Sequence, residues 1–296
     1  KTAIKIIGDE TDMYAQGYFA YDSKKSGGLT VSHLRFGKDP IKSTYQIINA
    51  DFIACHKQSH VLKYDVLEAL TDGGVFLYNC DLTPETVGEY LPNSLKRQLA
   101  QKHAKFYIID AVKIAHEIGL GSRLNMVMQS AFFKLADIIP MEEAVKHLKA
   151  GIEKTYRKKG EAVIKMNWAA VDAGCEAIQE VPVPPEWADL EGDLQLETFG
   201  EHFVDDVMIP MNAQQGDKLH VSAFVDMADG TFPLGTSKFE KRGTANHLPK
   251  WKPENCIQCN QCSLVCPHAA IRPFLLNEEE KKNAPEDYDT IPAIGD

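Results

Sequence analysis

The chain has 296 residues, of which 44% are hydrophobic and 25% charged, so its composition is that of a globular protein with room for one sizeable domain and smaller ones. No apolar run approaches the ~18 residues of a membrane-spanning helix. The formal net charge is -10, and an acidic chain without a basic stripe repels phosphate backbones. Neither a membrane protein nor a nucleic-acid-binding protein is therefore expected.

Five runs in the first 110 residues have the composition or the alternation of β-strands. A short β-branched run at Ala3–Gly8 is the first of them, and residues 29–36 alternate with the strand period of two. The other three are apolar runs typical of buried strands, at residues 51–55, 74–80 and 105–109.

Helices are predicted between these strands. Apolar residues recur at helical spacing from Val61 to Leu70, and the Asp-Gly-Gly sequence at 72–74 is expected to end that helix. A second helix is predicted near Pro92 to Gln101, and Asp110 is a candidate cap for a third. Alternating strands and helices predict a three-layer α/β domain with a mainly parallel sheet.

Beyond Gly121 the pattern is helical only, with apolar stripes that predict helices at 124–138, 141–152 and 161–178. Three prolines at 182, 184 and 185 then hold the backbone extended and mark the main domain boundary. Between residues 181 and 217 there are nine carboxylates and no lysine or arginine. We expect an α/β domain at 1–180, an acidic connector domain at 181–248, and the first half of a ferredoxin-like domain at 249–296. The tail from Asn277 is expected to be solvated and disordered.

The most specific single signal is a run of four cysteines, Cys256, Cys259, Cys262 and Cys266, closed by Pro267. These spacings match the bacterial ferredoxin pattern, and thiolates suit iron-sulfur clusters or zinc. A structural zinc site needs a second pair about 15 to 20 residues away, and none follows Cys266. Iron-sulfur binding is therefore favoured. In two-cluster ferredoxins the cysteine before the proline ligates the other cluster, so three of the cysteines are expected to hold one 4Fe-4S cluster and Cys266 to reach a second.

The other cysteines and the histidines give weaker signals. The odd count of seven cysteines, without an apolar signal peptide, predicts a reducing cytoplasmic compartment and makes disulfides the weakest option. Cys55, Cys80 and Cys175 lie in apolar surroundings and are expected to be small buried hydrophobes. His56 and His60 are four residues apart, but no further ligand accompanies them, so no metal site is expected there.

A lysine- and glycine-rich stretch, Lys24-Lys25-Ser26-Gly27-Gly28, offers ammonium groups, a hydroxyl and accessible backbone amides. Such groups can bind a phosphate or a pantetheine carbonyl. The alternative is an ordinary turn before a strand. Arg35 is a weaker candidate, since its place at the end of an alternating strand is equally consistent with a salt bridge across the sheet.

A series of longer motifs occurs in chain order: DMYAQGYFAYDSKKSGG at 12–28, SHLRFG at 32–37, GLGSRLN at 119–125, QSAFFK at 129–134 and AVDAG at 170–174. Together with the cysteine run, these motifs closely resemble the pyruvate:ferredoxin (flavodoxin) oxidoreductase family. The resemblance extends through most of the chain. It implies an internal piece of such an enzyme, made of the gamma-like third domain, the small fourth domain and the start of the ferredoxin-like fifth.

The resemblance implies an enzyme that decarboxylates pyruvate on thiamine diphosphate with Mg²⁺, passes electrons through 4Fe-4S clusters to ferredoxin or flavodoxin, and captures the acetyl group on coenzyme A. It implies Ser26, Asn125 and Asn167 as coenzyme A contacts, with Lys25 and Arg35 as further candidates. The thiamine and pyruvate sites of the family lie outside this stretch, so the chain alone is expected to be inactive. The intact enzyme is expected to be a homodimer.

Two alternatives remain open. One is a free-standing electron-transfer or coenzyme-binding subunit that partners separate catalytic chains. The other is a related enzyme that acts on a different 2-oxoacid, because no residue of this stretch is expected to contact the acid.

Overall fold

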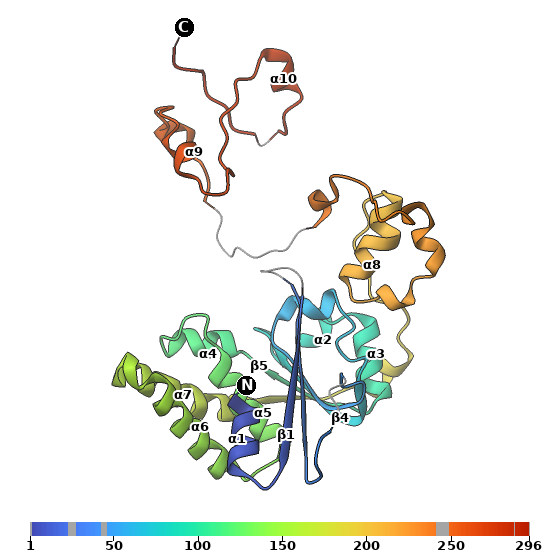
Figure 1. Ribbon diagram of the computed structural model, residues 1–296, viewed down its shortest axis with the longest axis vertical. Helices are drawn as coiled ribbons and strands as arrows, with labels where there is room; N and C mark the ends of the chain where they lie inside the picture. The colour runs from blue at the N-terminus through green and yellow to red at the C-terminus, as the bar shows by residue number, and fades with distance from the viewer. Residues whose placement is uncertain (1, 23–27, 43–45, 241–248, 287, 296) are drawn as a thin grey trace. The chain divides into compact units, whose positions relative to one another are not determined.

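The computed structural model describes residues 2–22, 28–42, 46–240, 249–286 and 288–295. The chain divides into two compact units, residues 1–242 and residues 243–296, and each is described by itself (Figure 1). Among the described residues, no helix is long and apolar enough to cross a membrane.

A four-stranded sheet forms the centre of the first unit (Figure 1). Its strands, in spatial order, are β3 (Ala50–Cys55), β4 (Leu70–Asn79), β5 (Lys105–Ile109) and β6 (Gln179–Val181). The first three are parallel and β6 is antiparallel, so the predicted, mainly parallel sheet is confirmed. In β4 the run Phe76-Leu77-Tyr78 is buried on both faces of the sheet, as expected for a central parallel strand.

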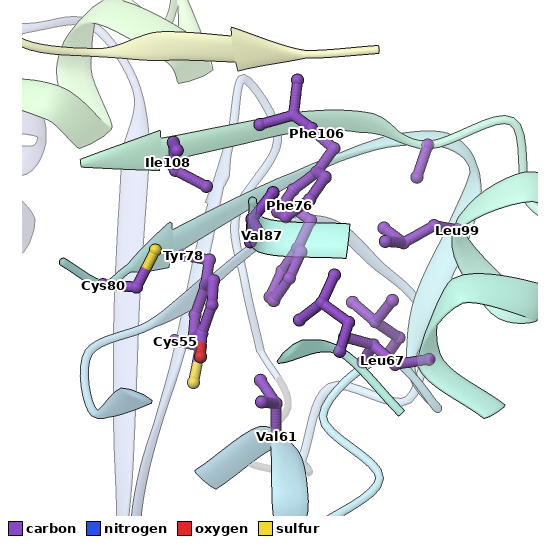
Figure 2. Close-up of a cluster of buried hydrophobic side chains, with 14 of the residues drawn as sticks. Cys55, Val61, Leu67, Phe76, Tyr78, Cys80, Val87, Leu99, Phe106 and Ile108 are labelled. Carbon is purple, nitrogen blue, oxygen red and sulfur yellow. The ribbon is translucent and has the colours of Figure 1, made fainter. Parts of the chain in front are cut away.

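Helices cover both faces of this sheet. On one face Phe76, Tyr78 and Phe106 pack against α2 (Val87–Tyr90) and α3 (Asn93–Gln101), as Figure 2 shows for part of this cluster. On the other face Leu77 and Ile109 pack against residues of α4 (Ala111–Glu117), α5 (Asn125–Ala136) and α7 (Glu161–Glu176). The predicted three-layer α/β architecture is therefore confirmed.

The helices predicted after Asp110 are confirmed. The side chain of Asp110 accepts a hydrogen bond from the Lys113 backbone N–H at 2.9 Å and so caps α4. Helix α6 (Met141–Tyr156) begins directly after Pro140, which separates it from α5. A short 3₁₀ turn, η2 (Arg157–Lys159), leads from α6 to α7.

The prediction of a strand at Ala3–Gly8 was wrong, because these residues lie in helix α1 (Thr2–Glu10). Ala3, Ile6 and Ile7 are buried at the spacing of one helical face, and they pack in a cluster with residues of α6. Tertiary contact here overrides the strand preference of β-branched residues. One side of an antiparallel ribbon, made of β1 (Tyr14–Tyr21) and β2 (Thr30–Gly37), packs against the same cluster.

The helix predicted from Val61 to Leu70 was also wrong. Only a 3₁₀ turn, η1 (Gln58–Leu62), forms in this region, and Leu70 already belongs to β4. The glycines do not end a helix but lie within β4, where the pairing shifts from Ala50 opposite Leu70 to Phe52 opposite Val75. Gly73 has φ 69°, a conformation that glycine adopts without steric cost, so the extra residues bulge out of the strand.

The acidic segment after β6 has short elements only, as expected for a connector. They are the 3₁₀ turns η3 (Pro185–Asp189), η5 (Gly216–Lys218), η6 (Val221–Met227) and η7 (Thr236–Phe239), the π-helical turn η4 (Val204–Met208) and helix α8 (Ile209–Asn212). Val181 of β6 pairs with Phe106, and Trp187 packs on the cluster beneath α3. The domain boundary at residues 181–185 stays a prediction.

The second unit contains the 3₁₀ turn η8 (Pro253–Asn255) and the helices α9 (Gln261–Val265) and α10 (Glu278–Lys282). The tail after Asn277 is exposed as predicted, but the prediction of disorder was wrong for residues 278–282. Asn277 and Glu280 form a reciprocal capping box, and the acidic first turn and basic last turn complement the helix dipole.

Candidate functional site

Helices α5 and α7 pack side by side because Gly174 allows a very close approach. A Cβ atom at that position would lie 2.4 Å from the Val127 carbonyl oxygen on α5. A Cβ at Gly119, which precedes α5 in the chain, would lie 3.4 Å from the sulfur of Met166 on α7. Met166 on α7 therefore lies beside Gly119, in the loop that precedes α5.

Two of the predicted coenzyme A residues lie on these two helices, Asn125 on α5 and Asn167 on α7. Asn125 is the first residue of α5 and is exposed. Asn167 is 6% exposed, and its Nδ2 donates to the Val163 carbonyl at 2.8 Å within α7. Asn125 is free to meet a ligand directly, whereas Asn167 has one of its amide hydrogens occupied by its own helix.

Lys25 and Ser26 lie outside the described residues, but the ends of their loop are defined. The Asp22 N–H donates to the Leu29 carbonyl at 3.1 Å, and the Leu29 N–H donates to the Asp22 carboxylate at 3.3 Å. A Cβ at Gly28 would lie 2.5 Å from the Asp22 Cβ, so this position requires glycine. Gly28 thus packs tightly against the residue that directly follows β1.

Arg35 lies on β2 and contacts neighbouring polar groups of the protein. Its Nη1 donates to Gln16 Oε1 on β1 at 3.1 Å, and its Nη2 donates to the Gln46 carbonyl at 3.0 Å. The alternative weighed from the sequence, a salt bridge across the sheet, stays a prediction, since these two partners are a neutral glutamine side chain and a backbone carbonyl. These contacts leave fewer donors for a ligand.

One further residue of α5 has a local environment that the sequence did not reveal. The Oε1 atom of Gln129 is buried and has no hydrogen-bond partner in the part of the chain that the structure describes. Gln129 was recognised as part of a motif but was given no role. The sequence did contain one signal for it, a polar residue among the apolar positions of α5.

The cysteine segment has a different character, since none of the described residues from 249 to 295 is buried. Cys256 follows η8, Cys259 and Cys262 are exposed, and Cys266 ends α9. Among the described residues, no three Cys, His, Asp or Glu side chains lie close enough together to hold a metal ion. The structure therefore does not gather the four thiols into one site.

The loop geometry of this segment nevertheless fits thiolate ligands. Gln258 and Asn260, on either side of Cys259, have the left-handed φ values of 56° and 57°, which turn the chain tightly between cysteines. The Ala270 N–H donates to the Cys266 sulfur at 3.3 Å. Backbone N–H groups, Ile271 first, lower the pKa of the Cys266 thiol and so favour its thiolate form. The donor set itself, four thiols, is that of an iron-sulfur cluster.

In the described ranges, the remaining cysteines and histidines form no cluster of three possible metal ligands. Cys55 and Cys80 are buried, as predicted, and burial raises the pKa of Cys55 to about 12 and that of Cys80 to about 11. Cys175 is partly buried. His60 lies edge-on to Tyr64 with ring centroids 5.2 Å apart. His268 is exposed.

Three profiles of protein families match the chain. Residues 1–177 match the family described as pyruvate ferredoxin/flavodoxin oxidoreductase. Residues 195–245 match a domain of unknown function, and residues 248–271 match a 4Fe-4S binding domain. The last match covers the four cysteines.

The whole chain also aligns with curated proteins. It is 56% identical over 296 residues to a pyruvate:ferredoxin oxidoreductase of Moorella thermoacetica, and 54% identical over 295 residues to a pyruvate-flavodoxin oxidoreductase of Enterobacter agglomerans. Each alignment covers 100% of this chain and 25% of the relative, so the chain spans a quarter of the length of these proteins. A solved pyruvate oxidoreductase subunit of Thermotoga maritima aligns with a TM-score of 0.47 and 20% identity, covering 60% of this chain and 86% of that chain.

Proposed function

Because the chain belongs to the pyruvate ferredoxin/flavodoxin oxidoreductase family, we propose that it is part of an enzyme that oxidatively decarboxylates pyruvate to acetyl-CoA and carbon dioxide. Ferredoxin or flavodoxin is the proposed electron acceptor. The part studied contributes coenzyme A contacts and iron-sulfur ligands. Thiamine diphosphate and Mg²⁺ are assigned to the rest of the enzyme.

The observation that carries this proposal is the alignment over the entire chain with relatives named for pyruvate and for ferredoxin or flavodoxin, at 54% to 56% identity. The alignment includes the cysteine run, which a 4Fe-4S binding profile matches independently. The α/β domain of this chain matches the oxidoreductase family, and its cysteine segment matches a 4Fe-4S binding domain. The presence of both in one chain favours an oxidoreductase over a protein that only binds a coenzyme.

For coenzyme A, the proposed contacts are Ser26, Asn125 and Asn167, with Lys25 and Arg35 as further candidates. Asn125 and Asn167 lie on two helices that pack against each other, which supports a shared site. Lys25 and Arg35 supply positive charge that suits phosphate groups. Of these two, Arg35 is the weaker candidate because Gln16 and Gln46 already accept from its guanidinium.

For the clusters, we propose that Cys256, Cys259 and Cys262 ligate one 4Fe-4S cluster and that Cys266 ligates a second. A bound cluster supplies one-electron transfer between the oxidised substrate and the acceptor. The backbone N–H that reaches the Cys266 sulfur supports a thiolate at that position. The missing ligands are assigned to residues beyond those present here, since three thiolates do not complete a cubane.

A free-standing coenzyme-binding subunit is less favoured, because both curated relatives carry the matched residues within a polypeptide of which they form only 25%. The remaining domains of the same enzyme are thus the proposed partners of this part. We propose further that the intact enzyme is a homodimer and that it lies in a reducing cytoplasmic compartment.

The test uses the natural polypeptide that carries these 296 residues, purified without oxygen. We expect acetyl-CoA formation that requires pyruvate, coenzyme A and an oxidised ferredoxin or flavodoxin together, with loss of acceptor reduction in Cys259→Ser. Asp81→Asn, at a distance in sequence from every proposed contact, serves as the matched control. Turnover of 2-oxoglutarate but not of pyruvate rejects the proposed substrate, and turnover independent of coenzyme A rejects the proposed role of this part.

A further inference from the structure

Gln129 lies one helical turn after Asn125 on α5, so the two side chains project from the same face of the helix. Its Oε1 atom is buried without a hydrogen-bond partner in the described part of the chain. Buried polar atoms are nearly always hydrogen-bonded in folded proteins, so an exception asks for an explanation.

The neighbours of Gln129 give no structural reason for a carboxamide. Val127, Met128 and Ala131 are buried among apolar residues on one side of α5, and Phe133 packs into the cluster that contains α1 and α6. The one adjacent hydroxyl, of Ser130, donates to the Val127 carbonyl at 2.9 Å. A leucine fills a similar volume without leaving an unpaired oxygen, so packing alone does not account for glutamine here.

We propose that Gln129 is a ligand-binding residue whose carboxamide pairs with a secondary amide of the pantetheine arm of coenzyme A. This inference rests on the proposed function, because Asn125, on the same face of α5, is a proposed coenzyme A contact. A carboxamide both donates and accepts, so it matches the N–H and C=O of a secondary amide. The arm carries two such amides, and the nucleotide end of the coenzyme carries none.

The side chain has the freedom that this role requires. The last torsion of glutamine is broad and roughly two-fold, so the carboxamide can exchange the positions of its oxygen and its nitrogen without a change in the backbone. An acceptor that has no partner in the ligand-free protein loses no internal hydrogen bond when it turns. Buried polar atoms that lack a hydrogen-bond partner within the protein are expected at functional sites.

The experiment replaces Gln129 with leucine in the natural polypeptide and measures two ligands by titration calorimetry, coenzyme A and adenosine 3′,5′-bisphosphate, which lacks the pantetheine arm. We expect Gln129→Leu to weaken coenzyme A binding about 10-fold, the effect of one lost hydrogen bond, and to leave the bisphosphate unchanged. The ligand-free Tm is expected to stay equal or rise, because an unpaired buried acceptor is removed.

Gln98→Leu is the matched control, since Gln98 Nε2 donates to Asp65 at 2.9 Å and serves the fold. It is expected to lower the Tm and to leave both affinities unchanged. Unaltered coenzyme A affinity in Gln129→Leu, or an equal loss for both ligands, overturns the inference. If Asn125→Ala still weakens coenzyme A in that case, the proposed function stands. If the parent protein binds neither ligand, the proposed function fails together with the inference.

Discussion

The α/β unit and the cysteine segment, residues 249–295, place their apolar side chains in opposite ways. In the first, Phe76, Leu77 and Tyr78 are each 0% exposed, and buried clusters lie on both faces of the sheet. Figure 2 shows the cluster that contains Phe76 and Tyr78. In the second, Leu264 is 86% exposed and Leu275 85% exposed. None of the described residues of that segment is buried.

This difference shows that two sources of stability operate along one chain. Burial of apolar surface contributes about 25 cal/mol per Å², so the α/β unit has a core of its own. The described residues of the cysteine segment form no such core, so we expect this segment to depend on the clusters that it is proposed to bind. In segments of this kind, metal-binding free energy is also folding free energy.

Removal of the proposed iron-sulfur clusters is expected to have the largest effect on this contrast. Chelation of iron from the anaerobically purified natural polypeptide should leave the backbone amides of residues 249–295 unprotected from hydrogen exchange. Strands β4 and β5 should keep their protection, because their core does not involve the metal. Hydrogen-exchange mass spectrometry before and after chelation measures both regions in one sample.

The 296-residue chain by itself is the control for this prediction. Its cysteine run supplies only part of the ligands that two clusters need, so anaerobic reconstitution with iron and sulfide is expected to load fewer than two clusters per chain. Two stable clusters per chain, or exchange protection of residues 249–295 that survives chelation, contradicts the prediction.

Truncation of one large apolar side chain in each region sharpens the comparison. Phe76→Ala is expected to lower the free energy of unfolding by about 3 to 5 kcal/mol, because it leaves a cavity beside Tyr78 and Phe106 in the core. Leu264→Ala is expected to change it by less than about 0.5 kcal/mol, since the side chain is exposed. Urea unfolding followed by circular dichroism measures both, and equal effects of the two variants would remove the distinction.

Much of the α/β unit could be predicted because local signals and packing agree there. The strand at Lys105–Ile109 and the cap at Asp110 occur where the sequence placed them. Residues 3–8 and 61–70 were assigned wrongly because short apolar runs fit either a helix or a strand. In both cases the neighbouring elements decide, α6 in the first and the β3 pairing in the second.

The candidate sites also differ in how far they could be predicted from local sequence. The cysteine run was found from spacing alone, because the spacing of ligands within a short stretch of sequence determines how they can surround a cluster. How Asn125 and Asn167 lie relative to each other depends on how α5 packs on α7, and the unpaired state of Gln129 depends on which donors lie around it. Neither property exists before the helices pack, so the sequence supplied the residues but not their surroundings.

A methyl group at the α5–α7 contact tests the packing of the two helices that carry Asn125 and Asn167. Gly174→Ala places a Cβ 2.2 Å from the Ser130 hydroxyl and 2.4 Å from the Val127 carbonyl oxygen. We expect a loss of about 1 to 3 kcal/mol in the free energy of unfolding as the helices separate, and weaker coenzyme A binding.

Gly151→Ala on α6 is the matched control, because a Cβ there meets nothing within 4 Å. This variant should gain roughly 0.5 to 1 kcal/mol from the better helix propensity of alanine. Chemical denaturation and calorimetry with coenzyme A separate the two variants. A stable Gly174→Ala protein with normal coenzyme A affinity would show that the close packing does not matter to the proposed site.

The smallest expected effect is a pH dependence that arises at His60 in the α/β unit. Burial, Lys57 and Lys63, in that order, lower the pKa of His60 from 6.5 to about 4, with His56 adding to the effect. Between these two values the unfolded chain binds a proton that the folded chain does not, so stability falls as the pH falls from 6.5 towards 4. Because the ring is partly exposed, solvent screening reduces the loss between pH 7 and pH 5 to about 1 kcal/mol. His60→Phe keeps the ring contact with Tyr64 and removes the titration, so the variant should lose less stability over the same interval in urea unfolding at the two pH values. An identical pH dependence in both proteins would assign the effect to other groups.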